Sequence, residues 1–278
     1  MTQPVTQREY WNSPVGEEWA RQADRTDKMF AELTRAGLDA LALQPGERVL
    51  DIGCGAGETA LTIARKVGPS GRAAGIDISR PLLELARERA QAEGFDVDFI
   101  DADAGAAAIP GAPFDAAFSR FGVMFFDDAI AAFSHIRTSL RSGGRLVFLC
   151  WRPFSENAWS YAAAQALTPL LPAPLQPADE SLPGPFFFAD PNKIKTILAA
   201  SGWRDVSVDP WDGNLIVGAD AKHAAGYLLK IGPCARAIKE YGLDPAAAEK
   251  LMIARLAQAQ TPAGVSLAAA CWIARAMA

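Results

Sequence analysis

The sequence predicts an α/β fold in which helices cover both faces of a parallel sheet. Short apolar runs alternate with segments of helical spacing from residue 48 to residue 150, and such alternation is typical of strand–helix–strand units. Half of the 278 residues are hydrophobic and 21% are charged, which is the composition of a globular chain with a core. In this architecture a ligand binds at the carboxyl ends of the strands.

The first elements follow from apolar spacing and turn residues. Residues 15–43 place apolar side chains at helical intervals and predict helices that end at 44–46, where Gln-Pro-Gly stands. The short apolar run at 48–53 is bounded by turn residues and predicts a buried strand. A helix then stops at Gly68-Pro69. Four more strands are expected at Ala73–Asp77, Val97–Ile100, Phe114–Ser119 and Arg145–Cys150.

Capping residues place the helices between these strands. Ser79 is a preferred N-cap residue, and Pro81 suits the first turn of the helix that follows. A later helix is expected over about residues 128–141, and Gly143-Gly144 is expected to form the turn before the fifth strand.

The second half of the chain departs from this rhythm. Seven prolines between residues 151 and 190 indicate an insertion. A helix over Pro191–Ala200 and a sixth strand over Trp203–Val208 follow, and residues 219–260 are again helical. Val265–Ile273 is interpreted as the last strand, with an alanine-rich terminal helix as the alternative.

Charge and residue counts limit the classes of function. With 27 basic and 32 acidic residues the net charge is −5, whereas nucleic-acid binding requires a clustered basic face. No run approaches the roughly 20 apolar residues of a membrane-spanning helix, and the polar N-terminus is unlike a secretory signal. The four cysteines lack paired spacing and only two histidines are present. We therefore expect a cytoplasmic protein with no metal site, no nucleic-acid partner and no membrane span.

The segment from Asp51 to Gly57 reads D-I-G-C-G-A-G and carries the strongest functional signal. A glycine turn between a strand and a helix lets backbone N–H groups approach a ligand closely. Nicotinamide-binding proteins carry G-x-G-x-x-G, but here Glu58 stands at the last glycine position, where it would repel a pyrophosphate. A nicotinamide-dependent oxidoreductase is therefore an alternative hypothesis that this motif does not favour. A nucleoside-binding protein without enzymatic activity is another alternative.

Acidic residues follow the next two strands. Asp77 ends the second strand, where a carboxylate can accept hydrogen bonds from both ribose hydroxyls of a nucleoside. Asp103 follows the third strand, where it can bond an adenine amino group, and Asp101 competes for that role.

These motifs resemble the signatures of class I S-adenosylmethionine-dependent methyltransferases, within the small-molecule branch that includes the ubiquinone/menaquinone C-methyltransferases. The resemblance covers residues 45–150 well and the remainder loosely. It implies S-adenosylmethionine as the cofactor. It also implies a Rossmann-like, mostly parallel sheet of seven strands, whose last strand is antiparallel, with helices on both faces and helical cap insertions.

The resemblance also implies cofactor roles. Gly53, Gly55 and Gly57 would lie alongside the methionine portion and the sugar. Asp77 would hold the ribose hydroxyls. Ile78 would lie against the adenine face, and Asp103 and Ala104 would meet the adenine edge. Ser119 and Arg120 would lie near the methionine end. The expected cofactor residues are Asp51, Gly53, Gly55, Gly57, Asp77, Ile78, Asp103, Ala104 and Ser119.

The segments outside this core are expected to surround the acceptor. Residues 1–44 would form an N-terminal helical cap, 45–150 the cofactor-binding core and 151–190 a substrate lid, while 191–278 would complete the sheet with a helical insertion at about 218–262. The expected pocket residues are aromatic: Tyr10, Trp11, Trp19, Phe121, Trp151 and Phe187.

The acceptor class follows from what the fourth strand lacks. Residues 119–126 do not show the Asn/Asp-Pro-Pro-aromatic pattern of enzymes that methylate exocyclic amino groups. Together with the aromatic residues, this predicts methyl transfer to a small, largely apolar or aromatic molecule by in-line displacement. Neither His135 nor His223 is assigned as a base. The helices around 234–258 can serve a homodimer interface or cover the sheet, and the sequence leaves both open.

Overall fold

The protein is described by a computed structural model over residues 6–175 and 179–278. Seven strands form one sheet in the order β3-β2-β1-β4-β5-β8-β6, and a short strand β7 pairs with β8. Only β8 runs antiparallel to its two long neighbours, β5 and β6, so the predicted sheet and its antiparallel last strand are confirmed. The strands are β1 (Arg48–Ile52), β2 (Arg72–Asp77), β3 (Asp98–Asp101), β4 (Phe114–Arg120), β5 (Leu140–Trp151), β6 (Arg204–Gly218), β7 (Gln260–Thr261) and β8 (Gly264–Met277).

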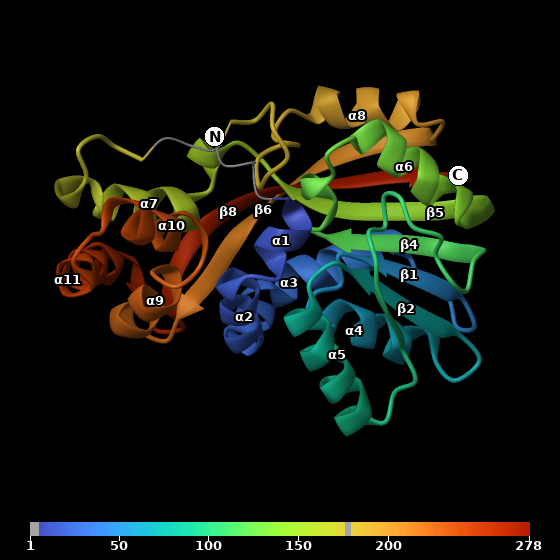
Figure 1. Cartoon of the computed structure of the whole chain (residues 1–278), viewed down its shortest axis with the longest axis horizontal. Coiled ribbons are helices and arrows are strands. Elements are labelled where there is room, and N and C mark those ends of the chain that lie inside the picture. Colours follow the sequence, from blue (N-terminus) through green and yellow to red (C-terminus); the bar gives the residue numbers. More distant parts are fainter. Residues whose placement is uncertain (1–5, 176–178) are drawn as a thin grey trace.

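Helices cover both faces of this sheet. In Figure 1, α4 and α5 lie on one side, and α6 and α8 lie on the other. Helix α3 packs on β4 and β5 and also contacts α4. The helices are α1 (Gln7–Trp11), α2 (Pro14–Arg21), α3 (Ala23–Leu41), α4 (Glu58–Val67), α5 (Arg80–Glu93), α6 (Ala129–Thr138), α7 (Ala158–Ala166), α8 (Pro191–Ala200), α9 (Ala221–Leu228), α10 (Gly232–Tyr241) and α11 (Pro245–Leu256). Within the described part of the chain, none of them is long and apolar enough to cross a membrane.

A helical lobe stands at one end of the sheet. Helices α7, α9, α10 and α11 pack on one another, and Figure 1 shows them gathered at the far end of β6 and β8. The lobe thus joins the proline-rich insertion to the late helical segment, which are far apart in the sequence.

The sixth strand is longer than the sequence predicts. It continues from Val208 to Gly218 because β8 pairs with it along this whole length. This stretch contains Pro210 and Asp212, which ordinarily indicate a loop. An edge strand tolerates both, because one side of its backbone has no neighbouring strand.

Three local predictions differ from the structure. Gly143-Gly144 is not a turn before the fifth strand but lies inside β5, at a shift in the register with β4. Ser79 stands at the N-cap of α5, yet its side chain makes no capping bond. Its hydroxyl instead donates to the carbonyl oxygen of Trp11, at 2.9 Å, because the end of α1 packs against this position. The helix expected over 128–141 also ends earlier, at Thr138.

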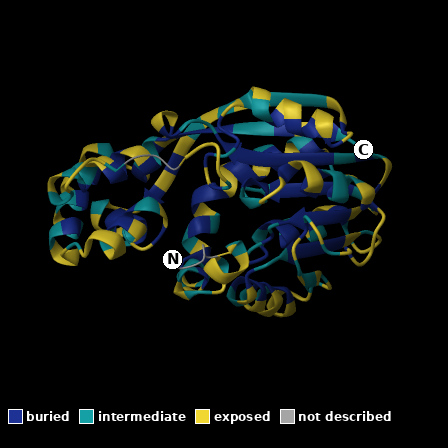
Figure 2. Cartoon of the chain, turned by 45° about the horizontal axis from the view of Figure 1, so that its top comes forward, coloured by how far each residue is buried: buried dark blue, intermediate teal, exposed yellow. Residues whose placement is uncertain are grey.

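The core follows the central strands. Figure 2 shows the sheet as predominantly buried, with exposed residues on the outer faces of the helices. Phe118 and Phe148 are fully buried, and the rings of Phe148 and Phe188 lie 5.7 Å apart. The third phenylalanine of the 186–188 cluster therefore belongs to the core and fastens the insertion to the sheet.

Candidate functional site

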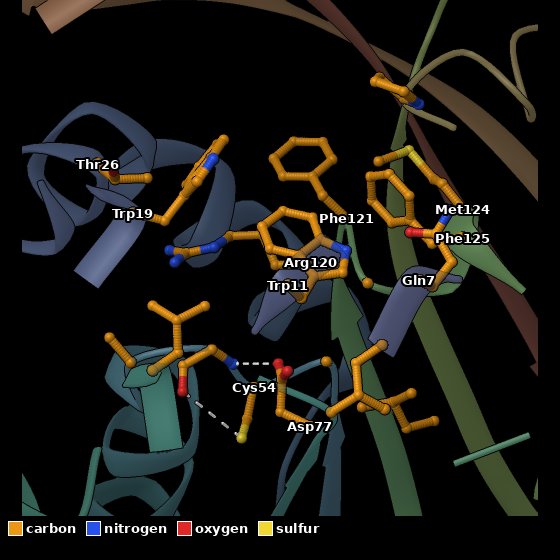
Figure 3. A pocket seen from close by; sticks show the side chains of 18 of the residues that line it. Gln7, Trp11, Trp19, Thr26, Cys54, Asp77, Arg120, Phe121, Met124 and Phe125 are labelled. Atoms are coloured by element: carbon orange, nitrogen blue, oxygen red, sulfur yellow. Dashed lines mark hydrogen bonds between the residues drawn. The ribbon is translucent and has the colours of Figure 1, made fainter. Parts of the chain in front are cut away.

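A cavity of about 310 Å³ opens at the carboxyl ends of the parallel strands. Its floor comes from the residues that follow β1, β2, β3 and β4, and its roof from the N-terminal helices and the helical lobe. Figure 3 shows Trp11, Trp19 and Phe121 facing Asp77 and the backbone beside Cys54 across this space. The position is the one that the parallel-sheet architecture predicts for a ligand.

Two glycines allow the floor to be built from bare backbone. Gly53 has a φ of +66°, and a Cβ added there would lie 2.7 Å from the Cα of Gly122. Any side chain at Gly53 would therefore push apart the turns after β1 and β4. The next glycine, Gly55, donates its N–H to Oδ2 of Asp77 at 2.8 Å, as the dashed line in Figure 3 shows.

Asp77 is held rigidly at the centre of the floor. Its Oδ1 accepts from the N–H of Ser79 at 2.8 Å, and its Oδ2 accepts from Gly55 at the same distance. Burial raises the pKa of Asp77, while these backbone donors act in the opposite direction. Each oxygen retains a lone pair, so the carboxylate can accept two hydroxyl groups from a neighbouring ligand.

The two acids near β3 have different surroundings. Asp103 lines the cavity, and its Oδ1 accepts from the N–H of Gly105 at 2.7 Å. Asp101 instead pairs with Arg8 of α1 at 2.8 Å and with Arg80 of α5 at 2.9 Å. Asp101 therefore fastens α1 to the core, and Asp103 is the acid that faces the cavity.

The predicted cofactor residues divide into a cavity wall and a layer behind it. The wall contains six of them: Gly53, Gly55, Asp77, Ile78, Asp103 and Ala104. Gly57 lies behind the wall, where a Cβ would come within 2.9 Å of the Ala86 side chain, so its lack of a side chain serves helix packing. Ser119 is fully buried and donates to the carbonyl oxygen of Ile52 at 2.8 Å, which joins the ends of β1 and β4.

Asp51 is also part of the supporting layer. It is buried at the end of β1, and Thr59 donates a hydrogen bond to its Oδ2. Its Oδ1 has no partner among the described residues. Burial raises the pKa of Asp51 from 3.8 to about 7, because an ionised carboxylate in this position loses its hydration.

This pKa predicts a pH dependence of folding. Between about pH 4 and pH 7 the folded chain retains a proton on Asp51 that the unfolded chain releases. The free energy of unfolding should therefore fall as the pH rises through this window, by up to about 1.4 kcal/mol per pH unit. Replacing Asp51 by asparagine should remove this part of the slope in urea denaturation.

Asp115→Asn is the matched control for that experiment. The N–H of Arg48 and the nearby Arg141 hold the pKa of Asp115 below its usual value. This variant should leave the slope between pH 4 and pH 7 as it is in the wild type. An unchanged slope in Asp51→Asn would show that Asp51 is ionised in the folded chain.

An ion-pair network closes one side of the cavity. Arg120, at the end of β4, contacts Asp27 of α3 at 2.9 Å and Glu58 of α4 at 2.7 Å. It also donates to the hydroxyl of Thr34 at 2.6 Å. Asp27 and Arg120 both line the cavity. Sequence patterns do not reveal this cluster, because its members come from separate elements.

Aromatic side chains form a wall beside this network. Phe121 and Trp151 stack with ring centroids 4.1 Å apart and an interplanar angle of 9°. Phe30 contacts both rings, and Trp159 packs on Trp151. Arg120 lies 5.6 Å from the ring of Phe30, which links this wall to the ion pairs.

Four of the six predicted pocket residues line the cavity: Trp11, Trp19, Phe121 and Trp151. Tyr10 lies outside the lining and is 42% exposed. Phe186 takes the place expected of Phe187, whose ring instead lies under the Lys193 ammonium group at 3.4 Å. Consecutive side chains point in different directions, so composition alone locates the cluster but not the member that faces the cavity.

The cavity is poor in groups that exchange protons near neutral pH. None of the described lining residues is a histidine, lysine, tyrosine or glutamate. His135 bonds the carbonyl oxygen of Ala107 at 2.7 Å, and His223 pairs with Asp220 at the start of α9. Cys54 lines the cavity, but burial raises the pKa of its thiol well above the ordinary value.

Comparison with known proteins agrees with this geometry. The family described as methyltransferase domain matches residues 49–144. Aklanonic acid methyltransferase DauC of Streptomyces sp. is 33% identical over 149 residues, which cover 53% of this chain and 67% of that enzyme. Demethylmenaquinone methyltransferase of Thermus thermophilus is 34% identical over 125 residues, or 45% of this chain and 56% of that enzyme.

Solved structures share the fold. Phosphoethanolamine N-methyltransferase 2 of Haemonchus contortus, in complex with S-adenosyl-L-methionine, superposes with a TM-score of 0.60. The match covers 99% of this chain and 60% of that chain at 18% identity, so it supports the architecture alone.

Proposed function

Because the chain belongs to the S-adenosylmethionine-dependent methyltransferases, we propose that it methylates a small, largely apolar or aromatic molecule in this cavity. The observation that carries the proposal is the division of the cavity into two chemically different parts. One part is the polar floor of backbone and carboxylates around Asp77. The other part is the aromatic wall around Phe121 and Trp151.

The floor fits S-adenosylmethionine. The Asp77 carboxylate suits the two ribose hydroxyls, and Ile78 offers an apolar surface to the adenine ring. A Cβ added to Gly55 would meet only one atom, of Leu82, at 4.0 Å, so space for a ligand lies directly over this backbone. When bound, the cofactor supplies an electrophilic methyl group on a sulfonium sulfur.

The protein's own contribution is orientation and exclusion of water. Asp77 and Asp103 fix the nucleoside end, while Trp11 and Trp19 cover the cavity from the N-terminal helices. The aromatic wall presses an apolar acceptor against the methyl group in an in-line arrangement, and aromatic faces favour a cation before transfer. None of the lining residues that the structure describes is a histidine, lysine or tyrosine, so we infer an acceptor atom that loses its proton readily.

Related enzymes support a small-molecule acceptor. They are named for aklanonic acid, demethylmenaquinone and nocamycin. The competing oxidoreductase is not favoured, because Glu58 stands where the nicotinamide fingerprint requires its third glycine.

Calorimetric titration with S-adenosylhomocysteine tests the proposal. We expect saturable binding with one molecule per chain, and no binding of NADH under the same conditions. A methyl-transfer assay against pooled phenols, quinols, carboxylic acids and amines should then yield S-adenosylhomocysteine with an aromatic member. Absence of binding at millimolar S-adenosylhomocysteine would contradict the proposed function.

A further inference from the structure

The cavity has an unpaired hydroxyl on its acceptor side. Ser160 lines the cavity from α7, close to Trp159, and the residue is only 2% exposed. Its Oγ has no hydrogen-bond partner among the described residues. Buried hydroxyl groups are nearly always paired. The side chain of Ser160 is therefore placed to bond a polar atom of a ligand.

The start of a second helix reaches the same cavity. Ile231, Gly232 and Pro233 line it, and α10 begins there with Ile231 as its N-cap. Isoleucine cannot cap a helix, and no side-chain capping bond is present. The N–H groups of Gly232 and Cys234 thus lack an intrahelical acceptor and carry partial positive charge, while Pro233 between them has no N–H. Since α10 packs against α7 and both helices contribute residues to the cavity lining, we name Ser160 together with residues 231–233 the α7–α10 corner.

We propose that the α7–α10 corner binds an anionic oxygen of the acceptor, in the form of a carboxylate or an ionised hydroxyl group. Helix N-termini favour such groups, and the Ser160 hydroxyl can donate to the same oxygen. This inference rests on the proposed function, because it places the acceptor between the corner and the aromatic wall.

The charges around the cavity agree with this placement. Asp77, Asp103 and Asp127 line the cavity from the segments at the ends of β2, β3 and β4, where they would repel an anionic group. Asp27 is compensated by Arg120 and Arg89, each at 2.9 Å. The aromatic lining residues Trp151, Trp159 and Phe186 carry no charge. The acceptor that fits is a flat aromatic acid whose anionic end points toward α7 and α10.

Charge-matched probes test the inference. With S-adenosylhomocysteine at saturation, the wild-type chain is titrated with benzoate, 2-naphthoate and 9-anthracenecarboxylate, and then with the corresponding arylmethylammonium ions. We expect at least one carboxylate to bind at least about tenfold more tightly than the ammonium ion of the same shape. Equal affinities, or no saturable binding by any carboxylate, would overturn the inference.

Three serine variants show whether the corner is responsible. Ser160→Ala should weaken carboxylate binding roughly tenfold to hundredfold, because a hydrogen bond to a charged oxygen is lost, while Ser160→Thr should retain most of the affinity. Ser201→Ala is the matched control, since Ser201 is also buried but bonds the Ile197 carbonyl oxygen on α8.

Two outcomes separate this inference from the proposed function. If Ser160→Ala lowers the affinity for S-adenosylhomocysteine and leaves carboxylate affinity unchanged, the corner serves the cofactor and the inference is wrong. If the wild-type chain binds no S-adenosylhomocysteine at all, the proposed function itself fails.

Discussion

Replacing Asp77 by alanine is expected to weaken the binding of S-adenosylhomocysteine about 100-fold or more. Both oxygens of Asp77 are oriented by backbone donors at 2.8 Å, and each can accept one ribose hydroxyl. Hydrogen bonds to a charged group contribute about 1.5–3 kcal/mol each, so losing two of them corresponds to at least about 3 kcal/mol of binding free energy. Calorimetric titration of the wild type and the variant measures the difference directly.

Asp98→Ala is the matched control for this prediction. Asp98 lies on the neighbouring strand β3, but it pairs with Arg72 at the opposite end of the sheet from the cavity. Its replacement should leave the dissociation constant for S-adenosylhomocysteine within about twofold of the wild type. Asp77→Asn keeps one oxygen acceptor without the charge and should fall between the two. Wild-type affinity in Asp77→Ala would show that the ribose assignment is wrong.

The second large effect is expected at Arg120. Its guanidinium group is the shared partner of Asp27 and Glu58, and all three side chains are mostly buried, with 13%, 15% and 27% exposure. Arg120→Met keeps much of the side-chain volume but leaves both carboxylates without this cation. Breaking buried ion pairs costs about 3–5 kcal/mol. Because Arg89 still compensates Asp27, we expect a loss near the lower end, about 3 kcal/mol.

Urea denaturation measures this loss, and Arg145→Met provides the comparison. Arg145 also forms a partly buried ion pair, with Glu47 at 2.7 Å, but it lies outside the cavity lining. Both variants should be less stable than the wild type. Only Arg120→Met should also weaken S-adenosylhomocysteine binding, because α3 then loses its attachment beside the floor. Equal cofactor affinity in the two variants would show that the Arg120 network has a purely structural role.

The core of the fold could be predicted because its signals are local. The strand before Gly53, the glycine turn and α4 follow one another within about twenty residues, and the acid at the end of β2 belongs to the next repeat of the same pattern. The seven-stranded sheet and its antiparallel last strand were predicted from resemblance to a known family, whereas the order of the strands was not predicted. The full length of β6 could not be predicted, because its Pro210–Asn214 stretch is held in the sheet only by pairing with β8.

The polar floor of the cavity was likewise predictable from the sequence, whereas its division into lining residues and a supporting layer was not. Gly57 and Ser119 carry the motif as clearly as Gly53 does, yet they pack behind the cavity. The backbone atoms that face the cavity depend on how the turns after β1 and β4 pack against each other. This packing joins segments that are distant in the sequence.

The sequence by itself determined the sheet, the glycine turn and the position of Asp77, because hydrophobic periodicity and turn chemistry act over a few residues. Only the tertiary structure decided which residues complete the site. Arg120 forms ion pairs with Asp27 and Glu58, and Ser160 and the start of α10 line one cavity, although these elements lie far apart in the chain. Such contacts leave no periodic signal, since the free energy that forms them comes from burial and charge pairing across the fold.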